Sequence, residues 1–138
     1  MKKPLDFTGG MGFSRAISSY NKCRKTLRFT PHDDHRCFAA IFDDEGRILY
    51  VKRAYGPQNW TTPGGRMENS ESPATALERE VREETGYLVR AGRLLGAYAA
   101  TFKDDLVLSI EAKIIGRETW EPNTEIAEVG FFAQDVLP

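Results

Sequence analysis

The sequence predicts an α/β fold, because segments with strand character lie on both sides of one well-delimited helix. The apolar residues 37–42 and 48–51 flank the turn-forming residues 43–46, so we expect a β-hairpin there. Residues 73–85 have a helical pattern. Three later apolar segments are predicted to be strands: residues 94–101, 106–115 and 126–133. This order indicates one mixed α/β domain.

The size and charge of the chain exclude several classes of protein. Its 138 residues are enough for one compact domain, which we expect to span residues 1–138. Lys and Arg number 19 against 20 Asp and Glu, so no net field favours nucleic acid or an anionic membrane. The longest apolar stretch, residues 94–102, is far shorter than the roughly 20 residues of a membrane span. We therefore expect no membrane partner.

Residues 1–30 are predicted to form a leader followed by a helix. Glycines punctuate residues 1–12, but the Gly-Lys-Ser/Thr ending of a phosphate-binding loop is missing. Ser14 is a suitable N-cap for a helix that runs to about Leu27. Cys23 and Cys37 form no CxxC pair, and no apolar run follows the basic N-terminus as in a signal peptide. Free thiols predict a reducing, cytoplasmic location.

The helix over residues 73–85 has clear end signals and a cluster of acidic residues. Ser72 can cap its N-terminus, Pro73 suits the first helical position, and Gly86 suits a left-handed C-terminal residue. The acidic residues have the spacing i, i+3 and i+4, which places them on one face of the helix. They are Glu80, Glu83 and Glu84.

These three like charges repel one another, so their proximity requires a physical explanation. A hard divalent cation such as Mg²⁺ prefers oxygen ligands and typically joins protein carboxylates to substrate phosphates. The alternative is a solvent-exposed charged face on which Arg79 and Arg82 balance the glutamates. Considered alone, the helix leaves both explanations open.

The segment around the helix resembles the Nudix box, G-x5-E-x7-R-E-U-x-E-E-x-G-U, in which U is an aliphatic residue. Residues 65–87 match this pattern at every charged and glycine position, from Gly65 through Glu71 and the helix to Gly86. The last position departs from it, because Tyr87 replaces the aliphatic residue. This changes packing rather than chemistry. The resemblance implies an α/β/α sandwich with a mixed β-sheet and a loop–helix–loop catalytic motif.

The resemblance also implies roles for individual residues of the box. In the Nudix family this motif binds Mg²⁺ or Mn²⁺ and positions a diphosphate. The positions that match the family's metal ligands are Gly65, through its carbonyl, Glu80, Glu83 and Glu84. Glu71 and Arg79 match a pair that braces the loop against the helix, which is a structural role.

Further residues are implied by their positions relative to the box. Glu68 matches a loop residue that in some members adds to the metal and substrate side of the site. Arg53 matches a position that often contacts substrate phosphate. Glu125 stands where some members supply a metal ligand or the general base, with Glu121 and Glu128 as rivals. The candidates for the general base are therefore Glu80, Glu83 and Glu125.

The implied activity is hydrolysis of the phosphoanhydride bond of a nucleoside diphosphate linked to another moiety. Cations neutralise the diphosphate and lower the pKa of a bound water, and a carboxylate takes its proton. The substrate class stays open among nucleoside triphosphates, nucleotide sugars and an RNA 5′ end, and a homodimer is compatible with the sequence. The competing hypothesis is a non-catalytic nucleotide-binding or regulatory module on the same fold.

Overall fold

The computed structural model describes residues 35–100 and 105–138 of the chain. Within these residues it has seven strands and one helix, in the order β1 (His35–Ile41), β2 (Ile48–Arg53), β3 (Trp60–Thr61), β4 (Gly64–Arg66), α2 (Pro73–Thr85), β5 (Tyr87–Ala100), β6 (Asp105–Arg117) and β7 (Ile126–Phe132). The leader and helix predicted for residues 1–30 lie outside the described residues. A single domain over residues 1–138 stays a prediction.

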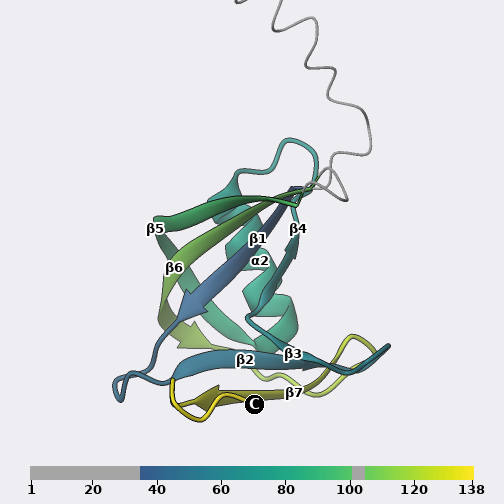
Figure 1. Cartoon of the computed structure of the whole chain (residues 1–138), viewed down its shortest axis with the longest axis vertical. Coiled ribbons are helices and arrows are strands. Elements are labelled where there is room, and N and C mark those ends of the chain that lie inside the picture. Colours follow the sequence, from purple (N-terminus) through teal and green to yellow (C-terminus); the bar gives the residue numbers. More distant parts are fainter. Residues whose placement is uncertain (1–34, 101–104) are drawn as a thin grey trace, which may run out of the picture. The chain divides into compact units, whose positions relative to one another are not determined.

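The strands form two sheets, with α2 packed on one of them (Figure 1). The four-stranded sheet has the order β4-β1-β6-β5, and the three-stranded sheet has the order β3-β2-β7. β1 and β6 run parallel while the other pairs are antiparallel, so the larger sheet is mixed. The α/β fold with a mixed sheet is confirmed. α2 is the only helix in the described part of the chain, so the second helical layer of the expected sandwich stays a prediction.

The predicted hairpin between residues 37–42 and 48–51 is wrong, although both strands exist. A tight turn joins them, in which the Asp43 N–H donates to the Arg47 carbonyl at 3.0 Å. Beyond the single bridge between Phe42 and Ile48, the two strands enter different sheets. The reason is that β4 and β6 already occupy both edges of β1, which leaves no edge for β2.

The three later strands are confirmed: β5 and β6 are longer than predicted, and β7 ends at Phe132, one residue before the predicted end. β5 begins at Tyr87, directly after the helix, rather than at residue 94. The short strands β3 and β4 were missed, because their sequences, Trp-Thr and Gly-Gly-Arg, are too short to show an alternating pattern. β4 pairs with β1 through Cys37 opposite Gly65, and so carries the start of the box into the sheet.

The predicted ends of the helix are confirmed residue by residue. The Ser72 hydroxyl accepts from the Thr75 N–H at 3.1 Å, and Pro73 occupies the first turn. Gly86 has a φ of 73° and donates its N–H to the Arg82 carbonyl at 2.9 Å. These caps satisfy backbone groups that a helix leaves unpaired at its ends.

The hydrophobic core lies between α2 and the four-stranded sheet. Leu77 and Val81 are fully buried on the inner face of α2, against alternate residues of β1 such as Ala39 and Ile41. The Glu78 carboxylate accepts from the Ala91 N–H at 2.9 Å and so ties the helix to β5. Because this packing fixes the inner face, the glutamates at positions 80 and 84 are directed towards β4. Across the described residues we find no helix with the length and hydropathy needed to cross a bilayer.

Candidate active site

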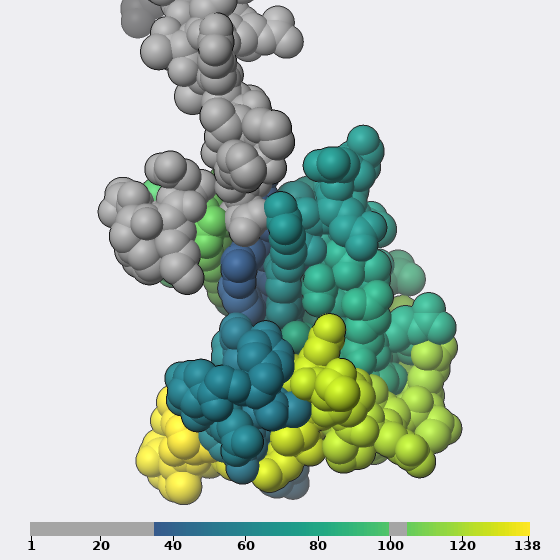
Figure 2. All heavy atoms as spheres, turned by 90° about the vertical axis from the view of Figure 1, so that its right-hand side faces the viewer, coloured from purple at the N-terminus to yellow at the C-terminus, as the bar shows by residue number. Residues whose placement is uncertain are grey.

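A cavity of about 290 Å³ is lined by residues from both sheets and from α2. Figure 2 shows β1 (dark blue) beside β4 (teal), with the segment that runs from β2 to β3 (blue) and residues preceding β7 (yellow-green) below them. The lining residues are Arg36, Phe38, Arg53, Tyr55, Thr61, Gly64, Gly65, Arg66, Glu80, Glu84, Glu125 and Ile126. Acidic, basic and aromatic residues therefore share one concave site, which has more charged residues than most ligand pockets.

Two adjacent glycines bring β4 close to both β1 and α2. Gly64 has a φ of 149°, and a Cβ atom there would lie 2.1 Å from the Cys37 carbonyl oxygen. A Cβ atom at Gly65 would lie 2.7 Å from the Glu80 carboxyl group. Only glycine fits the backbone conformation and the close backbone contact at position 64, whereas a side chain at position 65 would displace the Glu80 carboxyl group. The glycines thus allow the Glu80 carboxylate to rest against the backbone of β4.

The carboxylates of Glu80 and Glu84 are held in the cavity wall with little exposure to water. The Glu84 carboxylate accepts from the Gly64 N–H at 2.8 Å, and the Glu80 side chain is only 16% exposed. Burial raises the pKa of the Glu84 carboxyl to about 8, with the Gly64 N–H opposing this shift and the Glu80 charge adding to it. Burial also raises the pKa of Glu80, which Arg79 partly offsets. Both carboxylates are therefore costly to ionise without a nearby cation.

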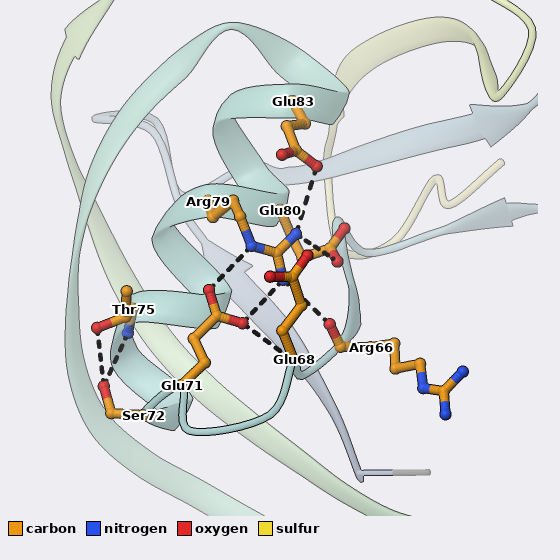
Figure 3. Close-up of polar contacts among 8 residues, drawn as sticks. All are labelled: Arg66, Glu68, Glu71, Ser72, Thr75, Arg79, Glu80 and Glu83. Carbon is orange, nitrogen blue, oxygen red and sulfur yellow. Dashed lines mark hydrogen bonds and ion pairs between the residues drawn. The ribbon is translucent and has the colours of Figure 1, made fainter.

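Arg79 is the centre of a hydrogen-bonded cluster that joins the loop of the box to α2 (Figure 3). Its guanidinium forms a bidentate pair with Glu71, with Nε to Oε1 and Nη2 to Oε2 both at 2.9 Å. Nη2 also donates to the Arg66 carbonyl at 3.1 Å. The Glu71 carboxylate in turn accepts from the Glu68 N–H at 3.0 Å. These contacts brace the loop against the helix, which is the geometry that a structural role of Glu71 and Arg79 requires.

Glu83 is placed differently from the other two glutamates of the helix. Its side chain is 58% exposed, does not line the cavity, and lies 3.4 Å from Arg79 Nη1. The same Nη1 donates to Glu80 at 3.0 Å. Within residues 35–100 and 105–138, no three acidic, His or Cys side chains already converge as a metal-binding cluster. A cation bound by Glu80 would therefore compete with the Arg79 guanidinium.

The cavity lining also includes Arg53 and Glu125, and two features of the backbone bring these residues together. The pairing of β2 with β7 shifts register between Lys52 and Arg53, and such a bulge re-aims the side chains that follow it. The Ala54 N–H then donates to the Glu125 carbonyl at 2.8 Å. The Arg53 guanidinium donates to the Tyr55 hydroxyl at 3.3 Å. Arg53, Tyr55 and Glu125 all line the cavity.

Three other candidates from the sequence do not reach the cavity. Glu68 is exposed and contributes its backbone to the loop, so its role towards substrate stays a prediction. Glu128 forms an ion pair with Lys52 at 2.8 Å on the three-stranded sheet. Glu121 is exposed in the segment before β7. Of the acidic residues 121, 125 and 128, the structure brings only Glu125 to the cavity.

The donors in the cavity fit a hard divalent cation. The carboxylates of Glu80, Glu84 and Glu125, which all line the cavity, are the kind of oxygen ligand that Mg²⁺ and Mn²⁺ accept. Burial raises the pKa of Glu80 and of Glu84, and the neighbouring carboxylates add to this shift, so ionising both side chains is unfavourable. A bound cation would compensate their negative charge. The thiol of Cys37 nearby is buried, and burial raises its pKa to about 11, so it is not a thiolate nucleophile.

Sequence reasoning missed several residues that line the cavity. Arg36 and Phe38 lie on the face of β1 opposite to the buried Cys37 and Ala39. The alternation along β1 contains this information, but it does not show which face adjoins the box. Arg66 lies within the box at a position for which the motif specifies no residue type. Its participation in the cavity follows from the pairing of β4 with β1.

The fold and the cavity define an α/β domain whose acidic loop–helix–loop segment forms one wall of a polar pocket. The model of the NUDIX domain matches residues 32–137, which is most of the chain. The chain belongs to the Nudix family.

Similarity to individual proteins is more limited in extent. The human diphosphoinositol polyphosphate phosphohydrolase 3-alpha is 44% identical over 62 residues, which are 45% of this chain and 37% of that protein. The match thus spans little more than a third of the length of that curated relative. An ADP-ribose pyrophosphatase from Streptococcus suis has a similar structure, with a TM-score of 0.68, 31% identity, and 79% of this chain and 78% of that chain covered. The structure of a UDP-X diphosphatase is also similar, with a TM-score of 0.70 and 28% identity. The match covers 99% of this chain and 63% of that chain.

Proposed function

We propose that this chain is a divalent-metal-dependent pyrophosphohydrolase, which cleaves the phosphoanhydride bond of a nucleoside diphosphate linked to another moiety. The observation that carries this proposal is one cavity whose lining includes the acidic residues Glu80, Glu84 and Glu125 together with Arg53. Membership of the Nudix family supports it, as do relatives whose names describe pyrophosphate hydrolysis.

The residues of the cavity have complementary roles towards a diphosphate. Glu80, Glu83, Glu84 and the Gly65 carbonyl would hold Mg²⁺ or Mn²⁺, which neutralises the diphosphate and lowers the pKa of a bound water. The Gly64 N–H keeps the Glu84 carboxylate oriented through its 2.8 Å hydrogen bond. Arg53 binds phosphate oxygens, because its planar guanidinium matches two of them at once. The Glu71–Arg79 pair keeps the loop in place during these steps.

A carboxylate must take the proton of the attacking water. The water oxygen forms a bond to phosphorus, the bridging phosphorus–oxygen bond breaks, and the bridging oxygen leaves with the second phosphate. Glu80 and Glu125 line the cavity and are suited to this role, whereas Glu83 reaches it only by leaving its contact with Arg79. A general base works only when it is deprotonated, so its protonation causes the fall of the rate at low pH. If Glu80 or Glu125 is the base, its Gln variant should lose this acidic limb of the pH–rate profile, and the Gln variant of the other residue should keep it.

The substrate class is a small-molecule nucleotide derivative. The names of the similar proteins include diphosphoinositol polyphosphate, ADP-ribose and UDP-X compounds, which share a diphosphate and differ in the attached groups. A nucleoside triphosphate, a nucleotide sugar and an RNA 5′ end all contain the bond to be cleaved. The buried, free thiol of Cys37 supports a reducing location such as the cytoplasm.

Hydrolysis of a panel of nucleoside diphosphate derivatives with Mg²⁺ or Mn²⁺ tests this function. We expect turnover by the wild type and a loss of about 100-fold or more in the Glu84→Gln variant, which keeps an acceptor for the Gly64 N–H. The matched control is Glu128→Gln, which removes an acidic group outside the cavity. Tight nucleotide binding without turnover across the panel would instead favour a non-catalytic nucleotide-binding or regulatory module.

We also propose that the chain forms a homodimer through β5. This strand is an edge of the four-stranded sheet, so one side of its backbone has no partner strand among the described residues. Its exposed apolar side chains include Leu94, Leu95 and Tyr98. A second copy paired along this edge would cover both features. Light scattering after gel filtration should give twice the monomer mass, and a monomer at high concentration would contradict the proposal.

A further inference from the structure

Two arginines directly oppose each other in the wall of the cavity. Arg36 on β1 and Arg66 on β4 are register partners in an antiparallel pair. Opposed residues in such a pair project from the same face, with Cβ atoms about 4.5–5.5 Å apart. Both side chains line the cavity that contains Glu80 and Glu84. This wall therefore has two guanidinium groups in addition to Arg53.

Other contacts set the positions of these two arginines. Arg36 Nε lies 3.8 Å from Oδ2 of Asp105, whose side chain is only 9% exposed. This ion pair connects Arg36 to the first residue of β6. Arg66 is held through its backbone, because its carbonyl accepts from Arg79 Nη2 at 3.1 Å. Figure 3 shows that the Arg66 side chain extends away from the Arg79 cluster. Arg66 therefore does not serve the brace with its side chain.

The charges in the cavity are divided between two regions. The acidic residues lie at α2 and before β7, where the Ala54–Glu125 hydrogen bond also brings Arg53 close. Arg36 and Arg66 lie on the paired strands β1 and β4 instead. An anionic group bound between two arginines that oppose each other on a sheet can accept hydrogen bonds from both of them. Two guanidinium groups also present enough N–H donors to bind several oxygens of one phosphate.

We propose that Arg36 and Arg66 form a second anion subsite, which binds a phosphate that the substrate carries beyond the diphosphate to be cleaved. The proposal rests on the proposed function for the position of the diphosphate. With this second subsite, the expected substrate is a compound with at least three phosphate groups, such as a nucleoside triphosphate. A nucleotide sugar, whose distal group is neutral, would leave the subsite unused. The cavity volume of about 290 Å³ is at the small end for ligand pockets, which suits a compact phosphate group.

Matched substrate pairs provide the test. UTP and UDP-glucose share the nucleoside and the diphosphate and differ in the distal group, as do ATP and ADP-glucose. We would measure kcat/KM with Mg²⁺ for the wild type, Arg36→Gln, Arg66→Gln and Arg36→Lys. The control is Arg93→Gln, which removes an exposed arginine that pairs with Glu111 outside the cavity. Thermal melting confirms that each variant is folded.

The wild type should prefer the triphosphate of each pair. Arg36→Gln and Arg66→Gln should each lower kcat/KM for the triphosphate about 10- to 100-fold and change the sugar derivative less than about twofold. Arg36→Lys should recover part of the loss, and Arg93→Gln should change neither substrate. Equal losses on both substrates, or a preference of the wild type for the sugar derivative, would overturn the subsite.

A binding measurement keeps the subsite testable if no compound is hydrolysed, an outcome that would refute the proposed function alone. Calorimetry with Mg²⁺ should then show inorganic tripolyphosphate binding at least about tenfold more tightly than pyrophosphate, with the difference lost in Arg36→Gln and Arg66→Gln. Equal affinities of the wild type for the two anions would rule out the second subsite.

Discussion

Gly64 and Gly65 are neighbours in β4, but an added methyl group meets a different obstacle at each. At Gly64 the obstacle is the Cys37 backbone, 2.1 Å away, and φ is 149°. Gly64→Ala should therefore lower the free energy of unfolding by about 3 kcal/mol or more. At Gly65 the obstacle is the movable carboxyl end of Glu80. Gly65→Ala should change stability by less than about 1 kcal/mol but displace a catalytic-site carboxylate and lower activity at least about tenfold.

Urea unfolding and kcat/KM for the two variants measure this difference. Gly46→Ala is a suitable control, because its added Cβ atom meets no atom within 4 Å and its positive φ of 75° imposes only local strain. A Gly65→Ala variant with full activity would show that the contact between β4 and Glu80 has no role in catalysis.

At this same scale, sequence reasoning could place the three glutamates on one face of the helix but could not predict their separate environments. Helical geometry is local, so the spacing of positions 80, 83 and 84 determines the shared face. Whether a carboxylate lines the cavity depends on partners distant in the sequence, such as the Gly64 N–H for Glu84. Arg79 Nη1 lies between Glu80 and Glu83, and side-chain rotamers of this kind have no signature in spacing.

The loop–helix unit shows the same contrast between local and distant determinants. Both ends of α2 follow from the residues at the ends themselves, Ser72 and Gly86, and were predictable. The assignment of β1 and β2 to different sheets was not, because it depends on which strands occupy the edges of β1. Arg36 and Phe38 were missed for the same reason, since β4 and the cavity are brought to them by pairing.

The brace between loop and helix should make the stability of this unit depend on pH. The Arg79 side chain and the Glu68 N–H hold the pKa of Glu71 at about 2, below its ordinary value of 4.5. A carboxyl group whose pKa is lowered in the folded state makes its full contribution to the free energy of unfolding above pH 4.5. This contribution is lost as the pH falls towards 2. The melting temperature of the wild type should therefore exceed that of Glu71→Gln at pH 6, with a smaller difference near pH 2.5.

Melting curves across this range, recorded in a chelator to exclude metal effects, measure the difference. Glu45→Gln is the matched control, because Glu45 is 73% exposed and lies 3.5 Å from Arg47. The difference in melting temperature between the wild type and Glu71→Gln could instead stay constant from pH 6 to about pH 2.5. That result would show that the charge of the Glu71 carboxylate does not contribute to stability.

At the scale of the whole molecule, the cavity lies where the two sheets meet, and the hydrophobic core also joins these sheets through Leu49 of β2. Glu80 and Glu84 belong to α2 on the four-stranded sheet, whereas Arg53 and Glu125 belong to β2 and to the segment before β7 of the three-stranded sheet. A cation held by carboxylates from both sides would link the two sheets. Metal binding should then stabilise the fold as a whole rather than the helix alone.

The size of this effect follows from mass action. With a dissociation constant of about 1 mM, 10 mM Mg²⁺ stabilises the folded state by about 1.4 kcal/mol, which raises the melting temperature of a chain of this length by about 3–5 °C. Glu84→Gln should lose most of this shift, and Glu128→Gln should keep it, because only Glu84 lies in the cavity. Scanning calorimetry against NaCl of equal ionic strength separates binding from charge screening. An equal shift in NaCl, or in Glu84→Gln, would show that these carboxylates hold no metal, and the proposed hydrolysis would then lose its chemical basis.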